Sequence, residues 1–511
     1  MALKRNLLAN FVGQGWVALV GIAFVPVYID RLGVEAYGLI GLYVVLQTWL
    51  SLLDLGMTPT LTREAARLSA GSHTAESIGD LVRSLEIIVF VLAGMMVLGI
   101  WCASEAIASH WLTPLALSHE TVAGAVAVIA FVIATRFCEG IYRGALFGFE
   151  RQVLYNSIYA LISTFRYAGA AVLVIFVPSI EAFFWWQAGF SLITVVLLAR
   201  ATHTTLPQAL RRPHFSAEAL RKVGVFAGGM SLTAVFALLF SQVDKVLLSR
   251  LVDLESFGLY MLAVALAGIF PMLAGPVASA FFPRLTAAVA ADDVAAERDL
   301  FRTGVQIVAL LAAPAVAVCM LAGHQIVMAW TGNAALASAM TPILGFVAVG
   351  AFCNAALQVP FMLQLAHGWT TLSVRINLLG AALLGPAVYI GTQVDGLVGA
   401  ATAWAFTNVL VLILATIVMH RRLLPEQLSF FATKGIAIPL AASCLAANMV
   451  VVTTESAQHE RIASLIIVVS AGLCAMVGAG LTLDIGRLWI KNVARLALLT
   501  GVRARNNGAM S

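Results

Sequence analysis

Charged side chains are scarce in this chain. Only 11% of its 511 residues are Asp, Glu, Lys or Arg, and 61% are hydrophobic, whereas a typical soluble domain is about 25% charged. A water-soluble core of this composition would leave large apolar surfaces exposed, so the composition excludes a soluble globular protein. No segment shows the sustained alternation of a membrane β-barrel, and the long apolar runs are typical of membrane-spanning helices.

Paired cysteines and metal-binding motifs are also missing. The six cysteines are scattered singly, without a C-x-x-C pair, and the nine histidines show no metal-ligand spacing. We therefore expect reduced cysteines and neither a metal nor a cofactor. The formal net charge is +5, but the basic residues are spread over many short loops. This distribution excludes nucleic acid as a partner, because nucleic-acid-binding proteins concentrate their positive charge on one face.

Apolar windows of about 20 residues predict fourteen membrane-spanning helices. The approximate limits of these windows are 7–29, 37–60, 81–102, 121–147, 153–178, 181–200, 223–248, 256–282, 303–322, 340–365, 370–391, 395–419, 434–453 and 462–483. If the N-terminus is cytoplasmic, most Lys and Arg residues fall in cytoplasmic loops, and only Arg31, Arg250 and Arg461 fall outside. Because this bias follows the positive-inside rule, we expect both termini in the cytoplasm.

Four cations interrupt the apolar windows. They are Arg136, Arg166, Lys245 and Arg375. A cation at the centre of a bilayer costs roughly 2.5–3.5 kcal/mol on insertion scales, so these side chains are candidates for binding an anionic substrate in a cavity. The guanidinium groups of Arg136 and Arg166, at similar depth in consecutive windows, suit bidentate binding of phosphate. Lys245 and Arg375 lie nearer the window ends, where they could also reach an interface.

Three acidic residues accompany these cations and are candidates for ion coupling or charge balance. Glu139 follows Arg136 by three residues on one helical face, so it either balances a substrate-binding Arg136 or forms a purely structural ion pair with it. Asp54 could bind a coupling proton or sodium ion, or could cap a helix that bends beside Gly56. Asp244 adjoins Lys245 in sequence, and we expect it to face another side of the helix and to pair elsewhere.

A short motif occurs twice. Residues 31–39 (RLGVEAYGL) resemble residues 250–259 (RLVDLESFGL), with one residue inserted, and an arginine follows each copy at the far end of the next window. Six windows separate the copies, which predicts a parallel internal repeat. The resulting division is an N-terminal bundle at 1–200, a cytoplasmic linker at 201–222, a second bundle at 223–419, and two further helices with a basic cytoplasmic tail at 420–511.

Several motifs in order resemble one transporter family. They are Pro26-Val27-Tyr28 leading to the first repeat copy, Asp54-Leu55-Gly56, Asp244-Lys245-Val246-Leu247-Leu248-Ser249, Gly258-Leu259-Tyr260 and Gly396-Leu397-Val398-Gly399-Ala400-Ala401. The chain here resembles the polysaccharide-flippase branch of the multidrug/oligosaccharidyl-lipid/polysaccharide exporter superfamily. The resemblance implies an all-α fold, with two pseudo-symmetric six-helix bundles around a central cavity and a C-terminal helix pair.

The same resemblance implies a transporter rather than an enzyme. It implies flipping of undecaprenyl-pyrophosphate-linked oligosaccharides across the bacterial cytoplasmic membrane by alternating access, for O-antigen or exopolysaccharide synthesis. The expected partners are this lipid-linked substrate, membrane lipids, and the polymerase and export machinery of such a pathway. Three alternatives stay open: a cation-coupled multidrug exporter of the same superfamily, a lipid II flippase, and a membrane glycosyltransferase. The cationic windows disfavour the exporter, and the short outside loops disfavour the enzyme.

Overall fold

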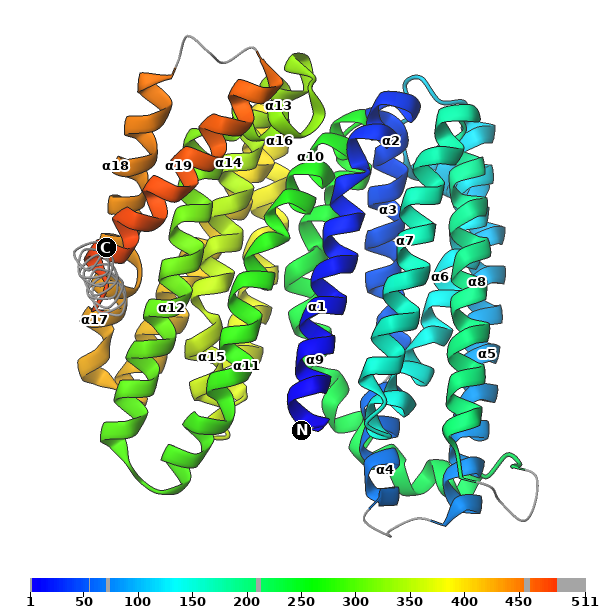
Figure 1. Cartoon of the computed structure of the whole chain (residues 1–511). Helices are drawn as coiled ribbons and strands as arrows, with labels where there is room; N and C mark the ends of the chain where they lie inside the picture. The colour runs from blue at the N-terminus through cyan, green and yellow to red at the C-terminus, as the bar shows by residue number, and fades with distance from the viewer. Residues whose placement is uncertain (1, 55, 70–73, 208–212, 455–459, 485–511) are drawn as a thin grey trace, which may run out of the picture. The chain divides into compact units, whose positions relative to one another are not determined.

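The computed structural model describes residues 2–54, 56–69, 74–207, 213–454 and 460–484, with side chains described there except at 2–9, 11, 69 and 218–234. Within these ranges all regular secondary structure is helical (Figure 1). Twelve helical segments of the described chain are long and apolar enough to cross a membrane. The expectation of an all-helical polytopic membrane protein is therefore confirmed.

The number of spans differs from the predicted fourteen for two reasons. Helix α16 (Thr371–Arg422) has 52 residues and contains the predicted windows 370–391 and 395–419. At 1.5 Å per residue it would be about 78 Å long if straight, far more than a membrane needs. Helix α9 (Ala217–Leu251) covers the window 223–248, but it is not among the twelve segments that meet the criteria in the described residues. The count of fourteen is thus not confirmed.

A sharp reversal divides α16. Asp395 and Gly396 have non-helical backbone angles, and Gly396 has a φ of 52°, a left-handed value that glycine adopts without steric cost. On either side of the reversal, Gly391 and Gly399 face each other so closely that a side chain on one would meet the backbone of the other. The two arms of α16 therefore form a tight helical hairpin.

The chain forms two compact units, Met1–Leu262 and Ala263–Ser511. The first contains α1 (Ala2–Ala23), α2 (Val25–Leu32), α3 (Val34–Leu50), η1 (Ser51–Asp54), α4 (Met57–Ser69), α5 (Ala75–Ala106), η2 (Ile107–Trp111), α6 (His119–Gly148), α7 (Gln152–Phe176), α8 (Ile180–Thr205), α9, and the first part of α10 (Leu254–Ala267). Its central helix is α6, which packs against α4, α5 and α8. Helix α9 packs on α3, α4 and α5, so this unit extends past the predicted linker 201–222.

The second unit contains α11 (Ile269–Ala290), α12 (Val294–Leu321), α13 (Gly323–Thr331), α14 (Ala334–Ala356), α15 (Gln358–Ala366), α16, η3 (Pro425–Gln427), α17 (Leu428–Ala432), η4 (Thr433–Ala437), α18 (Ile438–Thr453) and α19 (Arg461–Thr482). Helices α18 and α19 pack against each other and on α12 (Figure 1), through small residues such as Ala317, Ala447 and Ala471. They are the predicted C-terminal helix pair. The predicted basic tail beyond residue 484 lies outside the described residues, and the division into two repeated bundles stays a prediction.

The two copies of the repeated motif meet within the first unit. A Cβ atom on Gly38 would run into the main-chain oxygen of Leu254, and one on Gly258 would run into that of Val34. In the repeat, Gly38 corresponds to Gly258 and Val34 to Leu254. The contact is therefore reciprocal, like the self-complementary interface of a twofold dimer.

One carboxylate holds the segment between η2 and α6. Glu35 is 7% exposed, and its oxygens accept hydrogen bonds from the main-chain N–H groups of Leu115 (2.6 Å), Ala116 (2.8 Å) and Leu117 (3.2 Å). The N–H of Leu254 in turn donates to the carbonyl oxygen of Thr113 at 3.0 Å. This segment thus connects the first copy of the motif to the second.

Candidate substrate cavity

The first unit encloses a cavity of about 340 Å³ that opens between η1, α4, α6 and α7. Its lining residues are Gln47, Ser51, Asp54, Thr58, Arg136, Phe137, Glu139, Gly140, Arg143, Tyr155 and Tyr159. Three of the residues that the sequence singled out, Asp54, Arg136 and Glu139, are brought together here. Sequence reasoning missed Tyr155 and Tyr159, although their spacing of four residues inside an apolar window places both on one helical face.

Helix α6 positions the charged wall of the cavity. Arg136, Glu139 and Arg143 follow one another along one face of this helix. The small residues that come next allow α4 to approach: a Cβ on Gly144 would lie 2.6 Å from the main-chain oxygen of Thr58. Close packing at glycine therefore sets the start of α4 against the charged face of α6.

Asp54 both lines the cavity and caps a helix. Its carboxylate accepts from the N–H of Thr58 at 3.2 Å and from the Oγ1 of Thr58 at 2.7 Å. The chain turns between them at Gly56, where φ is 79°. The capping geometry that the sequence offered as an alternative is therefore present, and it leaves Asp54 facing the same space as Arg136 and Glu139.

Arg136 and Glu139 do not form the structural ion pair that their spacing permits. Among the described residues, no ion pair with an N···O distance within 4.0 Å joins their side chains. The guanidinium of Arg136 instead donates through Nη1 to the hydroxyl of Tyr159 at 3.3 Å. The Nε of Arg136 and the Oε1 of Glu139 are buried without a hydrogen-bond partner, and Glu139 is only 6% exposed. Each of these two side chains thus lines the cavity and has one polar atom that makes no hydrogen bond.

Arg166 lies on α7 but outside the cavity lining. It is 1% exposed, its Nη2 donates to the Oγ of Ser163 at 3.4 Å, and its guanidinium stacks 5.0 Å from the ring centre of Tyr167. Its Nε has no partner. The Arg166 charge nevertheless acts on Glu139 and on Tyr43. Arg166 therefore adds positive potential near the cavity without lining it, whereas Arg136 is the deep cation that lines the cavity.

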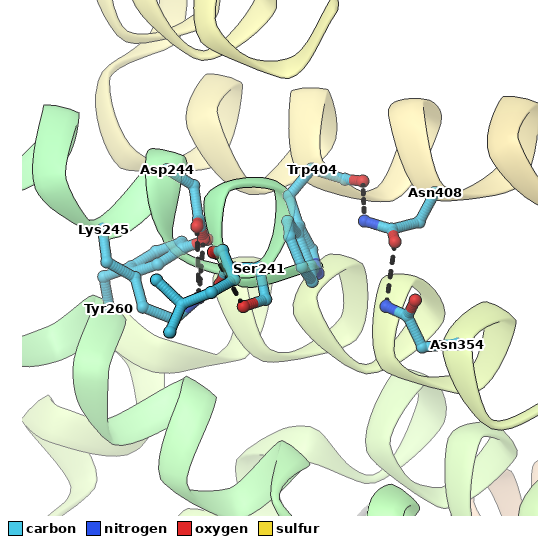
Figure 2. Close-up of polar contacts among 8 residues, drawn as sticks. Ser241, Asp244, Lys245, Tyr260, Asn354, Trp404 and Asn408 are labelled. Carbon is cyan, nitrogen blue, oxygen red and sulfur yellow. Dashed lines mark hydrogen bonds and ion pairs between the residues drawn. The ribbon is translucent and has the colours of Figure 1, made fainter. Parts of the chain in front are cut away.

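Lys245 and Asp244 pair with each other (Figure 2). Asp244 has a partner on another helix, as expected, but the long Lys245 side chain also folds back and places Nζ 3.1 Å from Oδ1 of its neighbour. Lys245 also donates to the Ser241 carbonyl at 2.7 Å, and the hydroxyl of Tyr260 donates to Asp244 at 2.7 Å. The Lys245 charge is thus balanced within the first unit.

In the second unit, Arg375 is an exposed residue of α16. The polar centre there is a pair of asparagines that sequence reasoning did not single out. Asn354 on α14 donates to the Oδ1 of Asn408 on α16 at 2.9 Å, and Asn408 donates to the carbonyl of Trp404 at 2.8 Å (Figure 2). Single asparagines inside apolar windows were the available signal. They join α14 to α16 and leave Arg375 outside that network.

Comparison with known proteins supports the architecture. A Shigella flexneri protein named "Putative O-antigen transporter" is 21% identical over 412 residues, covering 80% of this chain and 96% of the relative. The structure of the lipid II flippase MurJ in an inward closed conformation matches with a TM-score of 0.72 at 11% identity, over 93% of this chain and 98% of that one. An inward-facing MATE multidrug transporter matches with a TM-score of 0.65 at 14% identity, over 81% and 96%.

At such low identity these structures share the fold alone. A family model described as "Polysaccharide biosynthesis protein" matches residues 3–289, a stretch that contains the first repeat copy, the whole cavity and the second copy. With more than half of its residues matched, this chain is a member of the polysaccharide biosynthesis protein family of polytopic membrane proteins.

Proposed function

We propose that this protein flips undecaprenyl-pyrophosphate-linked oligosaccharides across the bacterial cytoplasmic membrane by alternating access, for the synthesis of O-antigen or exopolysaccharide. The family membership and the name of the Shigella relative support the polysaccharide class, and the shared fold with two transporters supports movement of a substrate. The lipid-linked substrate and the membrane are the essential partners, and a polymerase and export machinery complete the proposed pathway.

The observation that carries the proposal is the unused bonding capacity of Arg136. A buried guanidinium costs free energy unless its donors are satisfied. A pyrophosphate oxygen would satisfy the free Nε and strengthen the site through charge-assisted bonds of roughly 1.5–3 kcal/mol each. Arg143 at the exposed end of the same helical face offers a second donor, and Arg166 adds positive potential from the next helix. The cavity therefore suits an anionic headgroup.

The remaining charged residues have supporting roles in the proposal. Asp54 and Glu139 are the candidates for holding a coupling proton or sodium ion beside the anion. Lys245 and Arg375 are proposed as later contacts along the substrate path. Because Asp244 neutralises Lys245 in this structure, a substrate contact by Lys245 requires that pair to open. In this proposal both termini lie in the cytoplasm, as the positive-inside rule predicts.

Two other transport functions use the same fold. A multidrug exporter of cations would favour an acidic or aromatic cavity. This cavity contains carboxylates and aromatic rings as well, and the deep Arg136 is the feature that favours an anion. A lipid II flippase would use the same pyrophosphate chemistry, and the identity of the accumulating lipid intermediate distinguishes it from an O-antigen or exopolysaccharide flippase.

Neutralising the arginines tests the function. Arg136→Gln should reduce flipping at least tenfold, from the loss of one or two charge-assisted bonds, while Arg136→Lys should keep part of the activity because it retains the charge without the planar fork. Arg166→Gln should also reduce flipping, because it removes a positive charge close to the cavity. The readout is accumulation of the lipid-linked repeat unit on the inner leaflet, with protein abundance measured alongside. Arg200→Gln, at an exposed position of α8, is the matched control. Wild-type flux in a well-expressed double mutant would refute the proposal.

A further inference from the structure

Arg136 and Glu139 lie on one face of α6, at a spacing that normally lets an arginine and a glutamate pair. The attraction between opposite charges grows as their surroundings become less polar, so a pair at a buried position should form more readily than one in water. Among the described residues this pair is absent, and both Nε of Arg136 and Oε1 of Glu139 are buried without a hydrogen-bond partner. Another contact must therefore hold the guanidinium away from the carboxylate.

The contact that competes with Glu139 comes from α7. Nη1 of Arg136 donates to the hydroxyl of Tyr159 at 3.3 Å, and this is the one hydrogen bond that the guanidinium makes among the described residues. Tyr43 also lies close enough to act electrostatically on Arg136, but no hydrogen bond joins these two side chains in the described part of the chain. Tyr159 is therefore the group that fixes the direction of the guanidinium.

The ring of Tyr159 is itself held in place by other rings. It stacks on the ring of Tyr155, with 5.4 Å between the ring centres and 12° between the ring planes. The Tyr155 ring in turn meets Phe147 on α6 edge to face, with 5.2 Å between the centres and 86° between the planes. Both arrangements are favourable for aromatic pairs. This row of rings gives the hydroxyl of Tyr159 a fixed place from which to accept the hydrogen bond of Arg136.

We infer that Tyr159 is a positioning residue of the substrate site, which turns the guanidinium of Arg136 away from Glu139 and keeps it available to an anion. The inference rests on the proposed function, in which Arg136 binds the pyrophosphate. Tyr159 acts through Arg136 rather than by contact with the pyrophosphate. Its neutral hydroxyl accepts one hydrogen bond and leaves the positive charge uncancelled, whereas the carboxylate of Glu139 would occupy the donors and balance the charge as well.

An ion pair within α6 would compete with the substrate. An anion that meets Arg136 paired with Glu139 has to break that pair before it binds, so its apparent affinity falls in proportion to the fraction of molecules in which the guanidinium is unpaired. If loss of the Tyr159 hydroxyl leaves about one-tenth of the molecules unpaired, the affinity falls roughly tenfold. The same loss has no such effect when residue 139 is uncharged, because no carboxylate is left to capture the guanidinium.

Calorimetric titration of the purified full-length protein with farnesyl pyrophosphate, a short isoprenoid pyrophosphate, tests this competition. The proteins compared in one buffer at neutral pH are the wild type, Tyr159→Phe, Glu139→Gln and the double variant. Tyr159→Phe should weaken binding roughly tenfold in the wild-type background, but by no more than about twofold in the Glu139→Gln background, and the difference measures the coupling of the two residues. Tyr43→Phe is the matched control, because it removes a hydroxyl near the same guanidinium, and it should bind the probe like the wild type.

A packing role for Tyr159, or direct contact with the probe, gives a different pattern. Either one would weaken binding equally in both backgrounds, and that result would overturn the inference, as would unchanged binding by Tyr159→Phe or an equal loss in Tyr43→Phe. If Tyr159→Phe is not monodisperse, Tyr155→Leu takes its place in the comparison, because it removes the ring that holds Tyr159.

Arg136→Gln, titrated alongside, tests the proposed function separately. It should bind the probe more weakly than the wild type in any case, because the guanidinium itself is lost. Binding as tight as that of the wild type, or failure of the wild type to bind the probe, would remove the proposed function together with the inference that rests on it. A loss of affinity in Arg136→Gln with no dependence of the Tyr159→Phe effect on residue 139 would remove the inference alone.

Discussion

At the scale of single residues, spacing along a helix shows which contacts are possible but not which ones form. Arg136 and Glu139 are three residues apart and could pair, yet Arg136 reaches across to Tyr159 on α7. Asp244 and Lys245 are adjacent, a spacing that does not usually bring side chains together, yet they pair at 3.1 Å. In the first case the neighbouring helix α7 supplies the partner, and in the second Tyr260 on α10 donates to the same carboxylate as Lys245.

The Asp244–Lys245 pair gives a prediction about stability. Asp244 is fully buried, so Asp244→Asn should remove the carboxylate that balances the charge of Lys245 and cost about 3–5 kcal/mol of stability. Lys245→Met alone should also destabilise, whereas the double substitution Asp244→Asn, Lys245→Met should recover much of the loss because no lone charge remains. Thermal unfolding in detergent measures this ranking. A double mutant no more stable than the worse single mutant would contradict a mutually neutralised pair.

At the scale of elements, small residues and one carboxylate position the helices around the cavity. The glycines of α6 admit α4, and Glu35 holds the segment that leads into α6. Apart from Gly140, which lines the cavity, neither feature touches it directly. Both features set the position of the backbone. Substitutions there should therefore change the geometry of the cavity rather than its charge.

Gly144 tests the placement of α4. Gly144→Ala puts a methyl group 2.6 Å from the main-chain oxygen of Thr58, which forces α4 away and moves Asp54 relative to Arg136. We expect a stability loss of about 1–3 kcal/mol, as for other overpacked sites, and weaker binding of farnesyl pyrophosphate. Gly94→Ala, where a methyl group meets nothing within 4 Å, is the control and should be neutral or stabilising. Identical effects at the two positions would argue against the packing explanation.

Glu35 gives a prediction about local opening. Glu35→Gln replaces an ionised acceptor of three main-chain N–H groups with one neutral oxygen, and hydrogen bonds to charged groups contribute roughly 1.5–3 kcal/mol. Amide hydrogen exchange over residues 112–117 should therefore accelerate at least tenfold. Its repeat counterpart Glu255 is exposed, so Glu255→Gln should leave exchange in this segment unchanged. Equal exchange in both variants would show that Glu35 does not hold the segment.

At the scale of the whole molecule, the charge bias of the loops predicts the orientation in the membrane. In a cysteine-free background, a cysteine replacing Leu115 should react with an impermeant reagent in intact spheroplasts, because residues 103–120 are predicted outside. A cysteine replacing Asp292, in the turn between α11 and α12, should react only after permeabilisation. Both positions are exposed. Reversed labelling would overturn the placement of both termini in the cytoplasm. Arg212, in the predicted cytoplasmic linker 201–222, lies outside the described residues.

Much of this architecture follows from the sequence because hydropathy is a local property. Each apolar window had to become a helix, since a backbone inside lipid must satisfy its own hydrogen bonds, and every predicted window corresponds to a helix in the structure. The family resemblance and the choice of Arg136 and Glu139 as candidate site residues likewise came from residue type and spacing. These features depend only on residues that are close together in the sequence.

Only the tertiary structure decided which side chains share one space. Asp54 and Tyr159 lie near Arg136 because glycines let α4 approach α6 and because α7 packs alongside α6. Neither packing arrangement can be predicted from hydropathy. The same packing buries Arg166 behind the wall and turns α16 back at Gly396. Charge in a membrane protein is costly wherever it is buried, so the sequence shows that each ion needs a partner; the packing of distant helices determines what that partner is.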